Sequence, residues 1–456
     1  MAKYKAYPEY KDSGVEWLGE IPSDWQTLCG KYVFKEIKEL STSGDEMLLS
    51  VSEYYGVKPR QEVIEDGDFI SRADSLIGYK KCQVNDLAMN IMLAWKCGLG
   101  VSKYEGIISP AYSVFRFDTA IALPGYMHYL LRTKIYTDHF KSLSTGVIDS
   151  RLRLYPEMFG GVEILLPELD EQVNIYAFLD HETAKIDNLI EKQQQLIELL
   201  KEKRQAVISH AVTKGLNPDV SMKDSGVEWL GEVPEHWVSV RVKQISSFIT
   251  SGPRGWSDFI TDEGNEIFLQ SGDLNNELGL QLDKAKRVSP PKNAEGVRTK
   301  LVAGDVVVCI TGANTGRVAI VPELSQSTYI NQHLSLIRPN TSTINSAFLG
   351  YSLASSVGRS FFDVAQYGLK EGLSLGNVSE APLALPPKHE QDVIVKYLES
   401  IRNNYDNLSR LSTIQIELLK ERRTALISAA VTGKIDVRDW VAPDTQDIEE
   451  SQEVNA

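Results

Sequence analysis

The chain contains two sequence segments twice, and this internal repeat limits the possible fold more than any other feature. Residues 11–25 and 223–237 are identical at twelve of fifteen positions, at an offset of 212 residues. A second pair, residues 166–213 and 385–432, matches at a constant offset of 219 residues without insertion or deletion. Each half of the chain therefore has a repeated start, a variable middle and a repeated end.

The variable middle parts, residues 26–165 and 238–384, share almost no sequence with each other. Short apolar runs such as 301–310 alternate with Gly, Asn, Asp and Ser, which is typical of short strands joined by turns. Helical patterns cover residues 126–142 and 346–364. Each middle part, called a body below, is therefore predicted to be a compact mixed α+β domain.

The repeated ends predict two long helices. Neither residues 171–212 nor residues 390–432 contain proline or glycine, and apolar residues recur at alternating steps of four and three, as in a coiled-coil seam. About 42 residues at ~1.5 Å per residue would span ~60 Å. We predict that the two helices pair; the alternative is that each one lies on a globular core. The expected seam residues are Ile186, Leu189, Leu196, Leu200, Leu408, Leu419 and Leu426.

The expected fold class is α+β, with two globular mixed bodies separated by a long two-helix antiparallel coiled coil and related by an internal pseudo-twofold repeat. The last residues are acidic and are expected to be disordered. The predicted division of the chain is 1–165 (first body with the repeated segment 11–25), 166–216 (central helix), 217–384 (second body with the repeated segment 223–237), 385–440 (C-terminal helix) and 441–456 (tail).

Composition places few limits on the partner. The net charge is −14, but most of the acidity lies in residues 166–237 and in the tail, so either nearly neutral body could still present a basic face to DNA. Four scattered cysteines predict neither a disulfide framework nor a zinc site, and they indicate a reducing cytoplasm. The apolar stretches are too short to span a bilayer, and the polar N-terminus predicts no secretory signal.

Motifs for catalysis are missing from the sequence. Neither Pro-Pro pair, at 290–291 and 386–387, has the flanking residues of a DNA amino-methyltransferase. Neither Pro-Asp pair leads into the carboxylate and lysine motif of a metal-dependent nuclease, and there is no Walker ATP-binding motif. The histidines show no metal-ligand spacing. We therefore expect that the chain is not an enzyme by itself and binds neither metal nor cofactor.

With this organisation the chain resembles the specificity (S) subunits of type I restriction-modification systems over nearly its whole length. The resemblance rests on two variable bodies, each followed by a long helix, and on the repeated Leu-Pro and Glu-Gln pairs at 166–172 and 385–391. Residues 304–317 and 331–338 are similar to segments of the family's target-recognition domains, and residues 90–112 are a looser equivalent in the first body.

The resemblance implies a sequence-specific DNA-binding subunit that recognises both halves of a split, asymmetric site. It implies double-stranded DNA and two modification (methyltransferase) subunits as partners, with two restriction (translocase and nuclease) subunits, in the cytoplasm and without a membrane. S-adenosylmethionine, ATP and Mg²⁺ are expected in those partner subunits, and the long helices are expected to dock them. Two rival hypotheses remain: a coiled-coil scaffold without DNA binding, and a cryptic methyltransferase that binds S-adenosylmethionine by itself.

Candidate DNA-contacting residues follow from side-chain chemistry, since Arg suits guanine and Asn or Gln suits adenine. The loop 311–317 is the first candidate, with a tight hairpin as the alternative. Arg254 stands near Trp256, for which a core position is the preferred alternative. The candidates of the first body could also form a solvated charged turn. The candidates are Tyr79, Lys80, Lys81, Lys96, Arg254, Trp256, Thr311, Asn314, Thr315 and Arg317.

Overall fold

The computed structural model divides into two compact units. The first unit consists of Met1–Gln193 and Ile414–Ala456, and the second of Gln194–Thr413. Each unit contains one body and half of each long helix, whereas the sequence-based division gave each helix a domain of its own. The tail that we expect to be disordered lies, from residue 443 on, outside the described residues. The residues described are 4–63, 75–291, 294–366 and 372–442.

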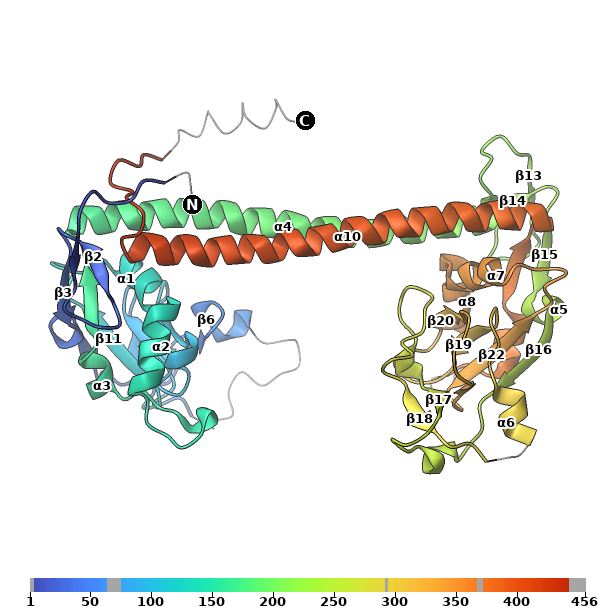
Figure 1. Ribbon diagram of the computed structural model, residues 1–456, viewed down its shortest axis with the longest axis horizontal. Coiled ribbons are helices and arrows are strands. Elements are labelled where there is room, and N and C mark those ends of the chain that lie inside the picture. Colours follow the sequence, from blue (N-terminus) through green and yellow to red (C-terminus); the bar gives the residue numbers. More distant parts are fainter. Residues whose placement is uncertain (1–3, 64–74, 292–293, 367–371, 443–456) are drawn as a thin grey trace. The chain divides into compact units, whose positions relative to one another are not determined.

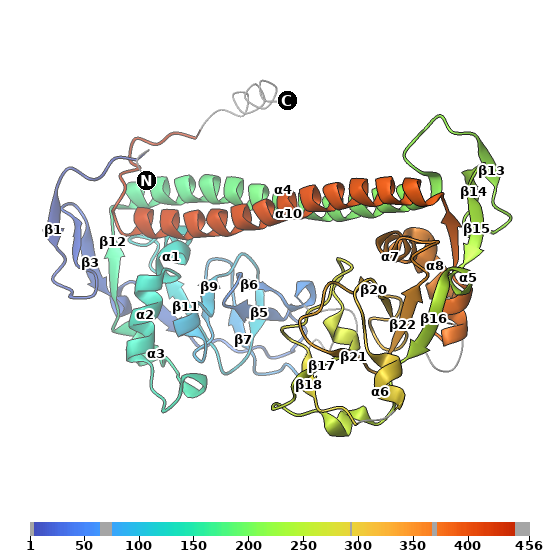
Figure 2. The same cartoon turned by 45° about the vertical axis from the view of Figure 1, so that its right-hand side comes forward.

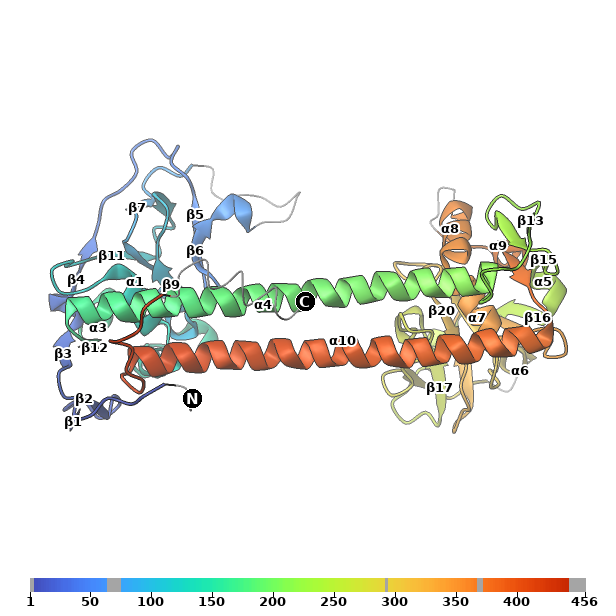
Figure 3. The same ribbon diagram turned by 90° about the horizontal axis from the view of Figure 1, so that it is seen from above.

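The expected long helices are confirmed as α4 (Leu169–Lys214) and α10 (Lys388–Val431), with 46 and 44 residues. Within each unit, half of α4 lies side by side with half of α10 and runs antiparallel to it (Figure 3). An ion pair fixes the register in each case.

In the first unit Arg423 Nε lies 2.9 Å from Asp187 Oδ1, and in the second Arg204 Nη1 lies 2.8 Å from Asp406 Oδ1. Because the two aspartates and the two arginines are each 219 residues apart, both halves of the helix pair have the same register.

The seam between the helices is narrower than the sequence pattern suggests. Seam residues seven positions apart, such as Leu419 and Leu426, are buried, and so are Ile186 and Leu200. The second expected row is not covered, because two helices that meet along one stripe leave the neighbouring stripe open. Its leucines Leu189, Leu196 and Leu408 are 45%, 39% and 47% exposed.

Both bodies are built around the same four-stranded antiparallel sheet, in which the last strand along the chain lies between the first and the second; Figure 1 labels all four strands of the second body. The strands of the first body follow the order β4 (Phe34–Ile37), β11 (Ser113–Phe117), β8 (Leu87–Met89) and β9 (Leu99–Val101). Those of the second body follow the order β16 (Ser246–Ser251), β22 (Leu334–Pro339), β19 (Val306–Cys309) and β20 (Val318–Ile320).

A buried carboxylate ties each sheet together. Asp86, just before β8, accepts two hydrogen bonds from Arg116 on β11, at 2.8 and 2.9 Å. Asp305, just before β19, accepts the same two bonds from Arg338 on β22, at 2.9 and 2.8 Å. Such forked pairing satisfies a charge that would be costly to bury alone. The two bodies therefore share a structural plan that their sequences do not reveal.

Shorter elements complete each unit. The predicted helix over 126–142 is two helices, α1 and α2, and that over 346–364 is likewise two, α7 and α8. In each unit the first of these lies against the helix pair (Figure 2). Those of the first unit are α1 (Pro124–Leu131), α2 (Lys134–Leu143), α3 (Pro156–Gly160), β1 (Tyr10–Asp12), β2 (Glu20–Pro22), β3 (Gln26–Cys29), β5 (Leu49–Ser52), β6 (Gly56–Pro59), β7 (Lys80–Cys82), β10 (Gly106–Ile108) and β12 (Glu163–Leu166). Those of the second unit are α5 (Val242–Ile245), α6 (Ala294–Thr299), α7 (Ser346–Ala354), α8 (Ser356–Ala365), α9 (Leu375–Glu380), β13 (Met222–Asp224), β14 (Glu232–Pro234), β15 (Val238–Arg241), β17 (Glu266–Leu269), β18 (Lys286–Val288), β21 (Thr328–Ile330) and β23 (Pro382–Leu385).

The repeated Glu-Gln pair seats the start of each long helix on its body. The amide of Gln172, which is fully buried, donates to the carbonyls of Pro167 and Ile121 at 2.9 Å each and accepts from Leu123 N at 2.8 Å. Trp25, also fully buried, donates from Nε1 to Glu171 at 3.0 Å.

The second helix has the same seat. Gln391 donates to the carbonyls of Pro386 and Thr343 at 2.9 and 3.1 Å and accepts from Asn345 N at 2.7 Å. Trp237 donates to Glu390 at 3.2 Å. The repeated motif is therefore a set of structural contacts that orient each helix on its body.

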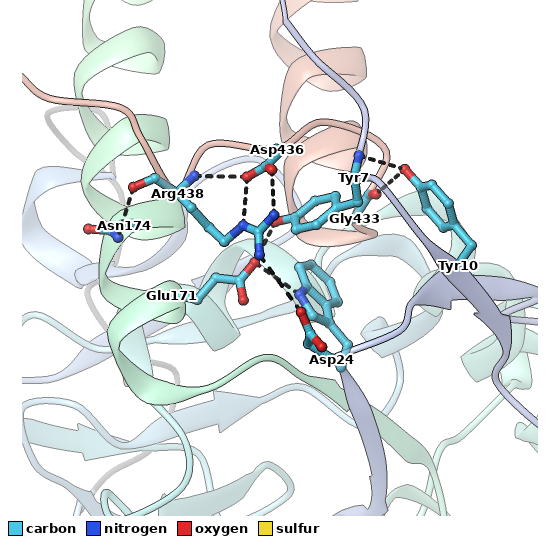
Figure 4. A network of polar contacts seen from close by, with 9 residues as sticks. Tyr7, Tyr10, Asp24, Glu171, Asn174, Gly433, Asp436 and Arg438 are labelled. Carbon is cyan, nitrogen blue, oxygen red and sulfur yellow. Dashed lines mark hydrogen bonds and ion pairs between the residues drawn. The ribbon is translucent and has the colours of Figure 1, made fainter.

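Tyr7 and Tyr10 contact the segment that follows α10 in the first unit (Figure 4). Tyr7 donates to Glu171 at 2.5 Å, and the guanidinium of Arg438 lies 4.9 Å from the centre of the Tyr7 ring. Arg438 is held in turn by Asp436, at 2.7 and 3.0 Å. In the second unit, by contrast, residues 215–221 run directly from α4 into β13. In the first unit, therefore, non-covalent contacts hold the N-terminal segment beside the end of α10. In the second unit the equivalent segment is covalently joined to the end of α4.

We predict that Gln391→Ala destabilises the second unit by about 1–3 kcal/mol, because Pro386 O, Thr343 O and Asn345 N lose their hydrogen bonds to its amide. Gln172→Ala should destabilise the first unit by a similar amount. Denaturant unfolding followed by hydrogen exchange of each unit measures both effects. Gln194→Ala, at an exposed position of α4, is the control and should change stability by less than about 0.5 kcal/mol. Equal effects of all three variants would contradict the role of Gln172 and Gln391 in holding the long helices on their bodies.

Candidate nucleic-acid interface

In each body, two connections meet at the same end of the four-stranded sheet. In the first body, residues 90–98 join β8 to β9 and residues 109–112 lead into β11, whose first residue pairs with the last residue of β8. In the second body, residues 310–317 join β19 to β20 and residues 331–333 lead into β22, which is paired with β19 in the same way. We call these connections the loop edge of each body.

The loop edge of the second body contains four of the predicted residues. Gly312 and Gly316 have positive φ angles of 91° and 81°, which the tight turn requires of glycine. Asn314 donates from Nδ2 to the carbonyl of Ser271 at 3.0 Å, and Arg317 donates to that of Leu274 at 2.8 Å. These contacts hold the loop in place, and a contact of either side chain with DNA stays a prediction.

The other two residues of this loop differ in exposure. Thr315 is buried, and its hydroxyl donates to the carbonyl of Gly312 at 2.6 Å. Thr311 is half-buried and is hydrogen bonded to His333, which belongs to the second connection of the loop edge. Thr315 therefore shapes the loop, while Thr311 links its two connections.

Two exposed residues of the loop edge were not among the candidates, although the sequence analysis had singled out the segment 331–338 that contains them. Gln332 and His333 are exposed beside Thr311, and their side chains contact each other at 3.3 Å. The largely buried Asn331 accepts from His333 N at 3.0 Å and so fixes their backbone. An amide and an imidazole on a fixed backbone can pair with base edges. The sequence signal that could have identified them is the Asn-Gln-His run directly before a predicted strand.

Arg254 and Trp256 follow β16, whose last residue pairs with Ser335 on β22. Arg254 therefore lies near the loop edge, and it is exposed. Trp256 is only 2% exposed and packs 5.4 Å from the ring of Tyr329. The aromatic residue beside Arg254 is thus a core residue and cannot stack on a base from this position, which corrects its place among the candidates.

The candidates of the first body are less closely grouped. Lys96 lies exposed in the loop edge, 4.9 Å from the ring of Trp95. Lys80, on β7, contacts the loop edge by donating to the carbonyl of Tyr112. Lys81 pairs instead with Glu46 at 3.6 Å. The side chain of Tyr79, just before β7, is half-buried.

Neither a metal centre nor a membrane span is found in the part of the chain that the structure describes. There, no three His, Cys, Asp or Glu side chains are grouped so as to hold a metal ion. No helix in these segments is both long and apolar enough to cross a membrane.

Comparison with known proteins finds the same type of protein by sequence and by structure. Residues 234–418 match the family model of the type I restriction modification DNA specificity domain. The chain is 23% identical over 433 residues to the MjaVIII specificity subunit of Methanocaldococcus jannaschii, covering 92% of this chain and 95% of the relative. It is 20% identical over 448 residues to the StySPI specificity subunit of Salmonella potsdam, covering 93% and 92%.

Solved structures show the same fold. A chain from a type I restriction-modification system, studied for its complex assembly and conformational transition, superposes with a TM-score of 0.69 at 17% identity, covering 91% of this chain and 99% of the other. The HsdS subunit of Thermoanaerobacter tengcongensis superposes with a TM-score of 0.53 at 18% identity, covering 91% and 98%. The repeated helices, the paired bodies and these relatives agree: over nearly its whole length this chain is similar to type I restriction-modification DNA specificity subunits.

Proposed function

We propose that each body reads one half of a bipartite, asymmetric DNA site and that the chain itself is not catalytic. The observation that carries this proposal is that one frame occurs twice with different loop edges. Both bodies keep the same sheet, the same Asp–Arg fork and the same helix seat. Their loop edges differ, with Lys96 in one and Asn314, Gln332 and His333 in the other. Two unlike loop edges on one frame suit two unlike half-sites.

The partners that we propose are double-stranded DNA, two modification subunits and two restriction subunits. S-adenosylmethionine, ATP and Mg²⁺ would then serve the partner subunits. In this assembly the chain supplies only recognition and docking.

The uncovered stripe of the helices is the docking surface that we propose for the modification subunits. Leu189 and Leu418 belong to the first unit and are 45% and 58% exposed. Their repeat equivalents in the second unit, Leu408 and Leu199, are 47% and 46% exposed. Rows of exposed leucine mark protein interaction surfaces. Two equivalent patches predict two equivalent subunits.

Exchange of residues 26–165 for the matching body of a relative should change one half-site and leave the other unchanged, because each body folds on its own frame. Sequencing of modified adenines in cells that carry the exchanged chain identifies both half-sites. The reciprocal exchange of 238–384 is the matched control and should alter the other half. A change of both half-sites after one exchange would contradict the two-reader proposal.

The double variant Leu189→Glu/Leu418→Glu should lose one modification subunit and keep the other, because only one patch gains charge. Both positions are exposed, so folding should be nearly unaffected. Native mass spectrometry of the assembled complex counts the bound subunits. Gln194→Glu/Thr413→Glu adds the same charge at exposed polar positions of the two helices and should leave both subunits bound. An undisturbed complex of the leucine variant would rule out this docking surface.

A further inference from the structure

Each unit contains a groove between its body and a long helix. In the first unit a groove of about 870 Å³ lies between α10 and the wall formed by α1, the start of α2 and the turn between β5 and β6. Tyr54, Arg132 and Lys134 line it from the body, and Lys420 and Arg423 from the helix.

Cations dominate this groove. Its lining contains Arg132, Lys134, Lys420 and Arg423 but only one carboxylate, Glu421. Lys134 pairs with Asp138, and Arg423 pairs with Asp187 in the helix register. Lys420 is exposed and makes no ion pair with any residue that the structure describes. The lining of the groove therefore contains more cations than carboxylates.

Arg132 connects the groove to the loop edge of the same body. Its guanidinium donates to the carbonyls of Cys97 and Leu99 at the end of the connection between β8 and β9, at 2.8 Å to Cys97. It also donates to the carbonyl of Glu53, at 3.0 Å, beside Tyr54. Because all these acceptors are carbonyls, the charge of Arg132 is not neutralised there.

The charge of this groove does not depend on histidine titration. His128 lines it and accepts a hydrogen bond at Nδ1 from Val101 N, at 3.2 Å. Burial lowers the pKa of His128 to about 3. The ring is therefore neutral near pH 7, and its proton on Nε2 is available as a hydrogen-bond donor. Between pH 5 and 8 the positive charge comes from Lys and Arg alone.

The second unit has a counterpart at the equivalent place. A groove of about 530 Å³ is lined by Gln205 on α4, the repeat equivalent of Thr424 in the first groove, and by the start of α8. Its body wall includes Asn314 and Arg317 of the loop edge, and Arg359 adds a second cation. Among the residues that the structure describes, no carboxylate lines it, and Arg359 pairs with Asp363 outside the lining at 3.2 Å. Both grooves thus combine cations and uncharged donors and adjoin a loop edge.

We propose that these two grooves bind the phosphate backbone of DNA beside each half-site. This inference rests on the proposed function, because DNA held at a loop edge would extend into the adjoining groove. A phosphodiester backbone suits lysine and arginine ammonium and guanidinium groups, tyrosine hydroxyls and amide donors. Phosphate contacts carry no sequence information. The groove residues outside the loop edges, such as Lys134, Lys420 and Arg359, would therefore set affinity and register, while the loop edges set specificity.

The test removes two exposed lysines of the first groove in the full chain, assembled with its modification subunits. DNA affinity of Lys134→Gln/Lys420→Gln is measured between 50 and 200 mM salt, on a duplex with the recognised site and on one with both half-sites changed. We expect the slope of log K against log salt to decrease in magnitude by about 1.8, since each phosphate contact contributes ~0.9. Affinity for both duplexes should fall by the same factor, with unchanged modified sequences.

The matched control, Lys38→Gln/Lys201→Gln, also removes two positive charges, but from residues outside both grooves. Its salt slope should stay that of the unmodified chain. An equal slope for both double variants would overturn the groove proposal and leave the proposed function standing. A loss of discrimination at one half-site would overturn the assignment to phosphate. Loss of a bound subunit, seen by native mass spectrometry, would make the groove a protein surface instead. If the unmodified chain did not distinguish the two duplexes, the proposed function itself would fail.

Discussion

The buried glutamine at the start of each long helix is the contact on which the other features depend. Gln172 and Gln391 each bind three backbone groups, among them the carbonyl of the proline five residues earlier. A buried amide with all its partners in place admits one position of the helix on its body. The register ion pairs Asp187–Arg423 and Asp406–Arg204 then fix the second helix within each unit. The grooves between body and helix, and the exposed leucines that we propose as docking patches, take their positions from this arrangement.

A frame of this kind can keep its shape while its surface changes. The forks Asp86–Arg116 and Asp305–Arg338 join the same strands in both bodies, although residues 26–165 and 238–384 share almost no sequence. The loop edges begin where these strands end, so they can vary without disturbing the sheet. A constant frame with variable loops allows the recognition surface to change without loss of the fold.

The sequence predicted the long helices correctly, because helix periodicity and the absence of proline and glycine are local signals. The sequence shows which residues form apolar stripes on a helix, but not which stripe the partner helix covers. Leu189, Leu196 and Leu408 were therefore assigned to the seam, although they are exposed. Gln332 and His333 were missed because exposed polar residues leave no periodic pattern. The groove could not be predicted at all, since Tyr54, Arg132 and Lys420 come together only through tertiary packing.

The central claim is that two independent readers are carried by one continuous pair of helices. It is tested most directly by inserting four residues into both helices, after Gln195 and after Ile414, which preserves the register within each unit. Four residues add nearly one turn and ~6 Å, while one base-pair step is ~3.4 Å. Sequencing of modified adenines should then show both half-sequences unchanged and a spacer longer by one or two base pairs. An unchanged spacer, or altered half-sequences, would contradict this account.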